Sequence, residues 1–166
     1  MSLSDEQHKI IDEFLNWVAA TARQKVPLVG TTRKMEGQGD FPDCLAMRLY
    51  TDTRTWLEVN VLVSEPKLRI GLATDSRTRN EEGEQLIEDS KDTLDEFLEL
   101  GLADAGYEDD VYKMEHFHES GIFYFATHLD TENIEAFAEE DGIRQKAMQV
   151  VEGYALAFEE MLDEDF

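Results

Sequence analysis

Apolar residues recur over residues 4–24 with the spacing of an amphipathic α-helix. Ser4 and Gln7 have the spacing of a capping box at the start of this segment. The apolar positions that follow are Ile10, Ile11, Phe14, Leu15, Trp17 and Val18. Pro27 lies beyond the expected end of the helix. The pattern predicts a first helix over 4–24 and, over the glycine-containing residues 28–43, a loop with at most a short strand.

Three segments in the middle of the chain alternate apolar and polar residues with the two-residue period of a β-strand. They cover residues 44–50, 55–63 and 67–73. In the second segment one face carries Leu57, Val59, Val61 and Val63, and the other carries Trp56, Glu58, Asn60 and Leu62. Because the connections between the segments are short, the pattern predicts an antiparallel meander.

A second helix is predicted over residues 80–101, where a narrow apolar stripe is surrounded by acidic residues and the segment ends in glycine. The stripe comprises Ile87, Leu94, Phe97 and Leu98. A β-hairpin is predicted next, over 110–118 and 121–129, because Ser120-Gly121 supplies the residues of a tight turn.

The last predicted element is a helix over residues 141–163, which follows a short turn over 132–140. Its apolar face comprises Ile143, Ala147, Val150, Val151, Tyr154, Phe158, Met161 and Leu162. The predicted order of elements is α-β-β-β-α-β-β-α. Runs of strands separated by helices predict an α+β fold, with an antiparallel sheet of about five strands and three helices, in a single domain over 1–166.

The charge of the chain is its largest departure from an average protein. It contains 15 Lys and Arg residues against 38 Asp and Glu residues, which gives a formal net charge of −23 and a pI near 4.3. A negative field of this size repels nucleic-acid phosphates and anionic membranes and attracts basic protein segments. We therefore expect a protein or peptide partner and neither a nucleic acid nor a membrane. Solubility alone is the other explanation of the acidity.

The compartment is predicted from what the chain lacks. No segment approaches the roughly 20 consecutive apolar residues of a membrane-spanning helix, and the first residues have neither the basic nor the apolar region of a signal peptide. The single cysteine, Cys44, has no second cysteine in the chain for a disulfide and is interpreted as a small apolar residue at the start of a strand. These features together predict a cytoplasmic protein.

Catalytic and cofactor motifs are not found: the chain has no phosphate-binding P-loop, dinucleotide fingerprint, HExxH helix or CxxC pair. We therefore expect no cofactor and no enzymatic activity. One alternative is a metal site or metal-dependent enzyme built on His116 and His118, which share a face of their predicted strand. Pairing across the predicted turn puts His128 on the opposite face. A second alternative is an acidic mimic of nucleic acid, with carboxylates spaced like phosphates.

Some apolar faces have two interpretations. The stripe on the first helix fits a partner-binding surface but is better explained as core. Trp56 and Leu62 raise the same question, because they lie on the side of their strand opposite Val59 and Val61. If helices cover only one side of the sheet, the other side must be covered by something else or must bind a partner.

The order of elements, the size and the acidic pI resemble the class I type III secretion chaperones and the bacterial sensory transduction regulators of the YbjN type, which share a fold. The resemblance covers nearly the whole chain and rests on no specific motif. It implies a homodimer without enzymatic activity that holds an extended segment of another protein against apolar patches. Carried over to this chain, it implies partner contacts at Phe14, Trp17, Val18 and Trp56, and dimer contacts at Leu94, Phe97 and Leu98.

The leading hypothesis from sequence is a non-catalytic, chaperone- or regulator-like protein-binding domain that acts through apolar surface and homodimerisation. It requires that a single copy leaves part of its helix stripes, or the Trp56 side of its sheet, uncovered.

Overall fold

The computed structural model describes residues 3–26, 32–38, 41–63, 67–107 and 112–162, with the backbone alone for 32–38, 41–44 and 140–141, so the side chain of Cys44 lies outside the description. The described strands form one antiparallel sheet in the order β1-β2-β3-β4-β6-β5. They are β1 (Thr32–Gln38), β2 (Phe41–Tyr50), β3 (Thr55–Leu62), β4 (Lys67–Thr74), β5 (Glu115–Glu119) and β6 (Ile122–Asp130). The α+β class and the antiparallel sheet are confirmed.

The five predicted strands all appear, and β2, β3 and β4 form the expected meander. β1 (Thr32–Gln38) is the short strand that the sequence allows inside residues 28–43, and it pairs with β2 as a sixth strand. At the other edge, Ser120 and Gly121 have φ angles of 50° and 83°. Two successive positive φ angles are what a tight hairpin turn needs, and this turn sets β5 beside β6 as predicted.

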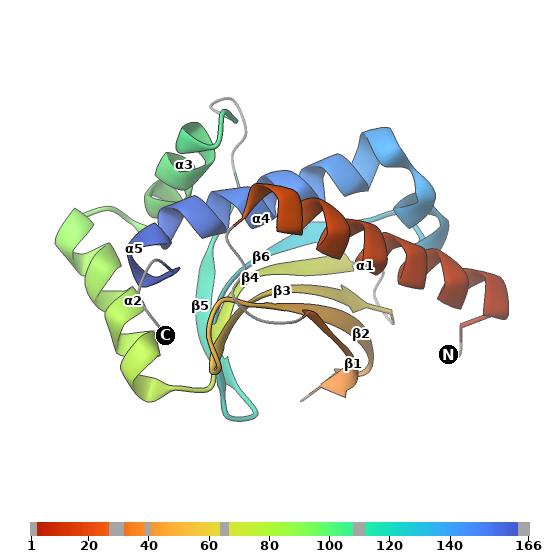
Figure 1. Cartoon of the computed structure of the whole chain (residues 1–166), viewed down its shortest axis with the longest axis horizontal. Coiled ribbons are helices and arrows are strands. Elements are labelled where there is room, and N and C mark those ends of the chain that lie inside the picture. The colour runs from red at the N-terminus through yellow and green to blue at the C-terminus, as the bar shows by residue number, and fades with distance from the viewer. Residues whose placement is uncertain (1–2, 27–31, 39–40, 64–66, 108–111, 163–166) are drawn as a thin grey trace.

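Helices α1 (Asp5–Lys25) and α4 (Gln145–Ala157) lie across one side of the sheet (Figure 1). The capping box at Ser4 and Gln7 is present, which confirms the predicted start of α1. The two helices bury apolar faces that comprise Ile11, Phe14, Leu15 and Val18 on α1 and Ala147, Val150, Val151 and Tyr154 on α4. Together with the strands beneath them they form the main hydrophobic core, which burial of apolar area stabilises.

The acidic segment 80–101 is two helices, α2 (Arg77–Ser90) and α3 (Leu94–Asp104), so the prediction of one helix is wrong. The chain leaves α2 at Lys91, whose φ is 62°. Thr93 then caps α3: its hydroxyl accepts from the Glu96 N–H, and the Glu96 carboxylate accepts from the Thr93 N–H. A second capping box therefore divides a segment whose apolar stripe is continuous.

Gly101 does not end a helix, because α3 continues to Asp104. It lies instead where α3 crosses α4. A Cβ atom at Gly101 would come within 2.3 Å of the Gly153 carbonyl oxygen, and one at Gly153 would come within 2.7 Å of Leu102 Cδ2. The two glycines allow the close crossing of the helices.

The end of the chain also differs from the prediction. Residues 132–140 include a 3₁₀ helix, η1 (Ile134–Ala138), and η2 (Glu140–Arg144) follows as a π-helical turn with non-helical backbone at Gly142. The helix predicted over 141–163 is interrupted again at Phe158 (φ −104°, ψ 22°), which separates α4 from α5 (Glu159–Leu162). The order α-β-β-β-α-β-β-α with three helices is therefore wrong.

The sheet has two sides, which we call the helix face and the second face. The helix face carries Leu57, Val59, Val61, Leu68, Ile70 and Leu72. The second face carries Arg48, Trp56, Glu58, Asn60, Arg69 and Tyr124. The division of β3 into these two faces agrees with the sequence prediction. Among the described helices, none combines the length and the apolar character that crossing a membrane requires.

Candidate functional site

The partner contacts implied on the first helix lie mostly inside the chain. Phe14 and Val18 are fully buried, and Trp17 is partly buried. The Phe14 ring packs against the Phe137 ring of η1, with the ring centres 4.9 Å apart. Phe14 and Val18 therefore lie in the core of a single copy of the chain, which is the interpretation of this stripe that the sequence favours.

The second face of the sheet and the implied dimer contacts are covered in the same way. Trp56 is 2% exposed and Leu62 is 4% exposed in a single copy of the chain. Phe97 and Leu98 are buried, and Leu94 is partly buried against the core. A dimer that formed through Phe97 and Leu98 would first have to remove them from that core.

The histidines are divided between the two faces, as predicted. His116 stacks on Phe125, with ring centres 3.9 Å apart, and its Nε2 lies 3.2 Å from a Glu84 carboxylate oxygen. His118 follows on the same face of β5, whereas His128 lies on the second face, beside Arg69 in register. In the described part of the chain no group of three or more His, Cys, Asp or Glu side chains is placed to hold a metal ion.

Two concave sites on the described surface lie beside α5. The first, which we call notch 1, has a volume of about 240 Å³. It is lined by Lys25, Val26, Ala105, Glu152, Ala155, Leu156, Glu159 and Leu162. Its buried lining residues are aliphatic and form what we call its floor (Val26, Ala155 and Leu162), and its exposed lining residues, Lys25 and Glu159, are charged and form its rim. The charge of Lys25 is offset by Glu152, whose carboxylate is 3.4 Å from the ammonium nitrogen and also accepts a hydrogen bond from the Tyr107 hydroxyl.

The second concave site, notch 2, has a volume of about 200 Å³. It lies between α2 and α5 and is lined by Glu82, Gln85, Leu86, Glu160 and Met161. Leu86 and the buried Met161 supply apolar surface, and the two carboxylates border it. Notch 2 therefore repeats the combination found in notch 1, an apolar floor with an acidic rim.

Helix α5 contributes two residues to each notch. Glu159 and Leu162 line notch 1, and Glu160 and Met161 line notch 2. Glu159 and Glu160 are both exposed, and neither has an ion-pair partner among the described residues. One short helix thus presents an available carboxylate to each of two apolar hollows.

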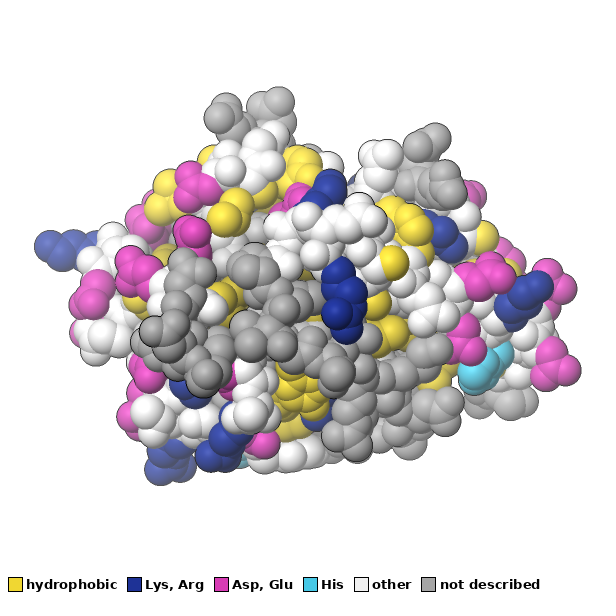
Figure 2. All heavy atoms as spheres, viewed as in Figure 1, with side chains coloured by type: hydrophobic (Ala, Val, Ile, Leu, Met, Phe, Trp, Pro, Cys, Tyr) yellow, Lys and Arg dark blue, Asp and Glu magenta, His cyan; other side chains and the backbone are white. Residues whose placement is uncertain are grey.

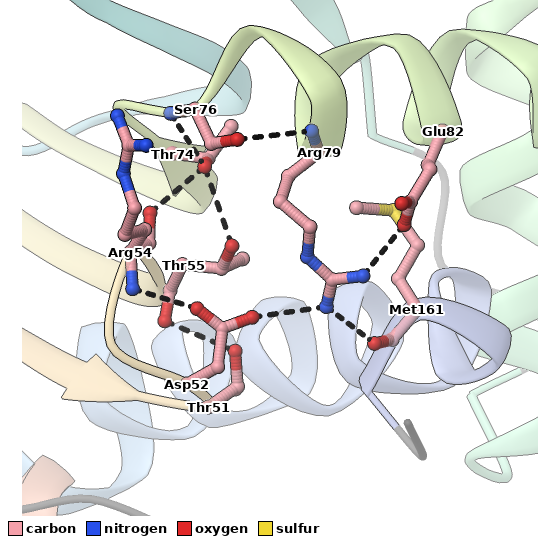
Figure 3. Close-up of polar contacts among 9 residues, drawn as sticks. All are labelled: Thr51, Asp52, Arg54, Thr55, Thr74, Ser76, Arg79, Glu82 and Met161. Atoms are coloured by element: carbon pink, nitrogen blue, oxygen red, sulfur yellow. Dashed lines mark hydrogen bonds and ion pairs between the residues drawn. The ribbon is translucent and has the colours of Figure 1, made fainter. Parts of the chain in front are cut away.

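Arg79 of α2 fixes α5 in this position (Figure 3). Its Nη2 donates to the Met161 carbonyl oxygen at 2.7 Å and to Asp52 Oδ2 at 2.9 Å. Its Nη1 donates to Glu82, which lines notch 2. Burial acts to lower the pKa of Arg79, but the carboxylates of Glu82 and Asp52 outweigh burial and the pKa is raised. Arg79 therefore remains a cation that ties α2, α5 and the β2–β3 turn together.

The turn that carries Asp52 is itself held rigidly (Figure 3). Asp52 Oδ1 accepts from the Arg54 N–H at 2.7 Å. The Arg54 side chain pairs with the Asp75 carboxylate at 2.7 Å, and its carbonyl accepts from the Thr74 hydroxyl at 2.8 Å. The Ser76 hydroxyl, one residue beyond Asp75, accepts from the Arg79 N–H and caps α2. Notch 2 is therefore bordered by fixed elements.

The surface around the notches is acidic. Figure 2 shows acidic side chains spread over α2 and α3, with few basic side chains between them. The exposed acids of these helices are Glu81, Glu84, Glu88, Asp89, Glu96, Glu99 and Asp104. Because like charges this close raise the local negative potential, a cation that approaches α5 is attracted before it makes contact.

A separate polar cluster lies buried on the second face. Glu58 and Arg69 each have 2% of their side-chain surface exposed, and their nearest charged atoms are 3.4 Å apart. Arg69 also pairs with Glu119 at 3.1 Å and lies 4.3 Å from the ring centre of Tyr124. Burial raises the pKa of Glu58 above its usual range, while Arg69 and Arg48 oppose the rise.

No protein-family model, no curated protein and no solved structure matches this chain. The sequence does not predict the notches, because its apolar pattern continues the preceding helix through α5. The available signal was Arg79, a basic residue at the start of an otherwise acidic segment in a chain with few cations. A lone arginine there predicts an ion pair, but the sequence does not say which distant carboxylates and carbonyls Arg79 contacts.

Proposed function

We propose that this protein is a non-catalytic binding domain that captures a basic, amphipathic segment of another protein across α5. The observation that carries the proposal is the pair of apolar notches on either side of α5, each bordered by an exposed carboxylate, Glu159 or Glu160. The proposal keeps the protein-binding role expected from the sequence. It replaces the buried helix stripes with α5 and its two notches as the place of contact.

The chemistry of the notches matches that of lysine and arginine side chains. These side chains bury an aliphatic stem along apolar surface and keep a charged head in water. In notch 2 a stem would lie on Leu86 and Met161 with its head at Glu160, and in notch 1 a stem would lie on Leu156 with its head at Glu159. A segment with basic residues in both notches gains from binding twice through one connection.

The expected affinity is modest, because each exposed ion pair contributes only about 0.2–1 kcal/mol. The acidity of the whole chain, with a formal net charge of −23, accelerates the encounter with a basic segment but does not select one. Selection must come from the apolar floors. A basic peptide with leucines should therefore bind more tightly than an equally basic peptide with serines.

Fluorescence anisotropy with labelled peptides of equal length tests the proposal. The probes are a lysine–leucine peptide, a lysine–serine peptide and a glutamate–leucine peptide. The lysine–leucine peptide should bind most tightly, and E159Q/E160Q should weaken its binding by about two- to thirty-fold. Leu86→Asn should weaken the binding of both lysine peptides, because each would lay a lysine stem on Leu86, and should weaken the lysine–leucine peptide more.

The matched control is D130N/E132Q, which removes two exposed carboxylates that line neither notch. Both double variants change the net charge equally, so a general Coulombic attraction would respond to both alike. Equal weakening by the two variants, or equal binding of the lysine–leucine and lysine–serine peptides, would contradict a site at α5.

A further inference from the structure

Notch 1 lies where two of the longer helices end, and this distinguishes it from notch 2. Its lining includes Lys25, the last residue of α1, with the C-cap residue Val26, and also Ala105, the C-cap residue of α3. The C-terminal end of a helix carries roughly half of a negative elementary charge and presents backbone carbonyls beyond the last intrahelical bonds. Notch 2 is lined instead by residues inside α2 and by α5, which is four residues long.

The carbonyls at the end of α1 are available as hydrogen-bond acceptors. The Val26 N–H donates to the Ala22 carbonyl at 2.8 Å. Among the described residues, no backbone N–H donates to the carbonyls of residues 23–25. In α3, by contrast, backbone N–H groups already bond to the carbonyls of residues 101–103. Notch 1 therefore obtains carbonyl acceptors from α1, and from α3 mainly the negative end of its dipole.

The carboxylates of notch 1 add to this negative potential. Lys25 and Glu152 offset each other across 3.4 Å, so Glu159, which is exposed and has no ion-pair partner among the described residues, supplies the net charge. A cation that enters notch 1 thus meets a carboxylate and helix-end carbonyls together. A guanidinium has five N–H donors in a planar fork and can bond to both kinds of acceptor at once, whereas an ammonium is a compact and strongly hydrated charge.

The chain already holds one guanidinium with these two kinds of acceptor, on the other side of α5. Arg79 donates to the Met161 carbonyl of α5 at 2.7 Å and to an Asp52 carboxylate oxygen at 2.9 Å, and it also bonds to Glu82 (Figure 3). A backbone carbonyl of a short helix and nearby carboxylates therefore suffice to fix an arginine here. Notch 1 offers the same combination to a side chain from outside.

We propose that notch 1 selects an arginine side chain of the bound segment, with its stem on Leu156 and its guanidinium between Glu159 and the last carbonyls of α1. This inference rests on the proposed function, because it assigns one position of the same segment. The volume of about 240 Å³ is below the ~300–1,000 Å³ of pockets for drug-sized molecules, which suits a single side chain. Notch 2, which lacks the end of a longer helix, accepts lysine and arginine alike.

Fluorescence anisotropy with three peptides of equal length tests the selection. They are the lysine–leucine peptide, its arginine–leucine equivalent, and the arginine–leucine peptide with every arginine asymmetrically dimethylated. The arginine peptide should bind about two- to ten-fold more tightly than the lysine peptide, which corresponds to one additional hydrogen bond. Dimethylation keeps the charge and blocks the paired hydrogen bonds, so the methylated peptide should bind no more tightly than the lysine peptide.

E159Q and E160Q are matched variants, because they remove the same charge from adjacent residues that line different notches. E159Q should bring the ratio of the lysine and arginine dissociation constants towards one, and E160Q should weaken both peptides and keep the ratio. Equal affinities of the two peptides for the wild type would overturn arginine selection and leave capture of a basic segment standing. A ratio that is lost in E160Q and kept in E159Q would overturn the assignment to notch 1. If neither peptide binds, the proposed function fails, and this inference fails with it.

Discussion

The two faces of the sheet bury different kinds of side chain. On the helix face, aliphatic side chains pack under α1 and α4, and the buried polar pair is satisfied: the Tyr154 and Thr127 hydroxyls are 2.8 Å apart, and Thr127 donates to the Lys113 carbonyl at 2.7 Å. On the second face, the buried Glu58 and Arg69 form an ion pair at 3.4 Å, and the buried Asn60 amide has no hydrogen-bond partner among the described residues. The strands are shared, so the difference comes from alternate residues of one sequence.

The two faces are expected to contribute to the free energy of unfolding with opposite signs. Burying apolar area under the helices is favourable by about 25 cal/mol per Å². Burying two charged side chains removes them from water, and their attraction often does no more than offset that cost. We therefore expect burial on the helix face to raise the free energy of unfolding, and burial of the charges on the second face to lower it. Keeping charges there is understandable if the face has a role besides folding.

The largest expected effect is from Arg69→Met, which leaves Glu58 buried without its closest cation. Removing one partner of a buried ion pair typically lowers the free energy of unfolding by about 3–5 kcal/mol. Urea denaturation, followed by circular dichroism, measures the change. A loss below about 1 kcal/mol would mean that the second face is hydrated in solution and is not the low-dielectric interior described above.

The matched double variant is R69M/E58Q, which also removes the Glu58 charge but keeps an oxygen to accept from the Trp56 indole N–H. It should recover at least half of the loss. If the double variant is no more stable than Arg69→Met alone, the penalty does not arise from burying the Glu58 charge without Arg69, and the electrostatic account of this face fails.

The sequence predicts the division between the faces but not the burial of the second one. The two-residue period places Trp56, Glu58 and Asn60 together, because alternation is a local property of an extended chain. Whether that side is covered depends on sheet curvature and on what the rest of the chain lays across it. A run that contains Glu and Asn reads as a solvated face, and here it is buried.

The break in the acidic helix and the α5 notches are two further features that the apolar pattern of the sequence does not predict. Ile87 and Leu94 are seven residues apart, as on one continuous helix, so the apolar pattern hides the break that Thr93 and Glu96 encode by capping. The notches require α5 to lie beside α2, and the bond from Arg79 to the Met161 carbonyl joins residues 82 positions apart. Local patterns carry no information on such a contact.

An intermediate effect is expected from a pair of glycine substitutions, one at the second face and one on the buried side of α2. A Cβ at Gly71 would lie 2.0 Å from the Phe125 carbonyl oxygen and 2.6 Å from Ala126 Cα. Those are backbone atoms, so β4 and β6 would have to separate, and Gly71→Ala should lower the free energy of unfolding by about 3 kcal/mol.

Gly83→Ala is the matched control, because its Cβ would meet the tip of the same residue, the Phe125 ring, at 3.0 Å. A ring can shift by a few tenths of an ångström, and alanine gains up to about 1 kcal/mol over glycine inside a helix. The net change should be near zero. Chemical denaturation of the two variants in parallel measures whether Gly71→Ala loses more free energy of unfolding than Gly83→Ala. Equal losses would contradict the close approach of β4 to β6.

The smallest expected effect is a pH dependence at the border of the second face. Burial lowers the pKa of His128, Arg69 and Lys67 lower it further, and Glu115 opposes them from 3.6 Å. The folded chain therefore takes up this proton less readily than the unfolded chain, whose histidine titrates near pH 6.5. Stability from this residue is present above that pH and is lost as the pH falls towards the folded-state value.

His128→Gln should remove that loss, so the difference in free energy of unfolding between wild type and variant should change between about pH 7.5 and pH 5. The change should stay well below the roughly 1.4 kcal/mol of one full pKa unit, because the side chain is about a quarter exposed. Glu115→Gln removes the one opposing carboxylate in direct contact and should steepen the dependence in an otherwise unchanged protein. A dependence of the opposite sign, with the wild type gaining stability on acidification, would mean that Glu115 outweighs burial and that this border of the second face behaves as solvent-exposed surface.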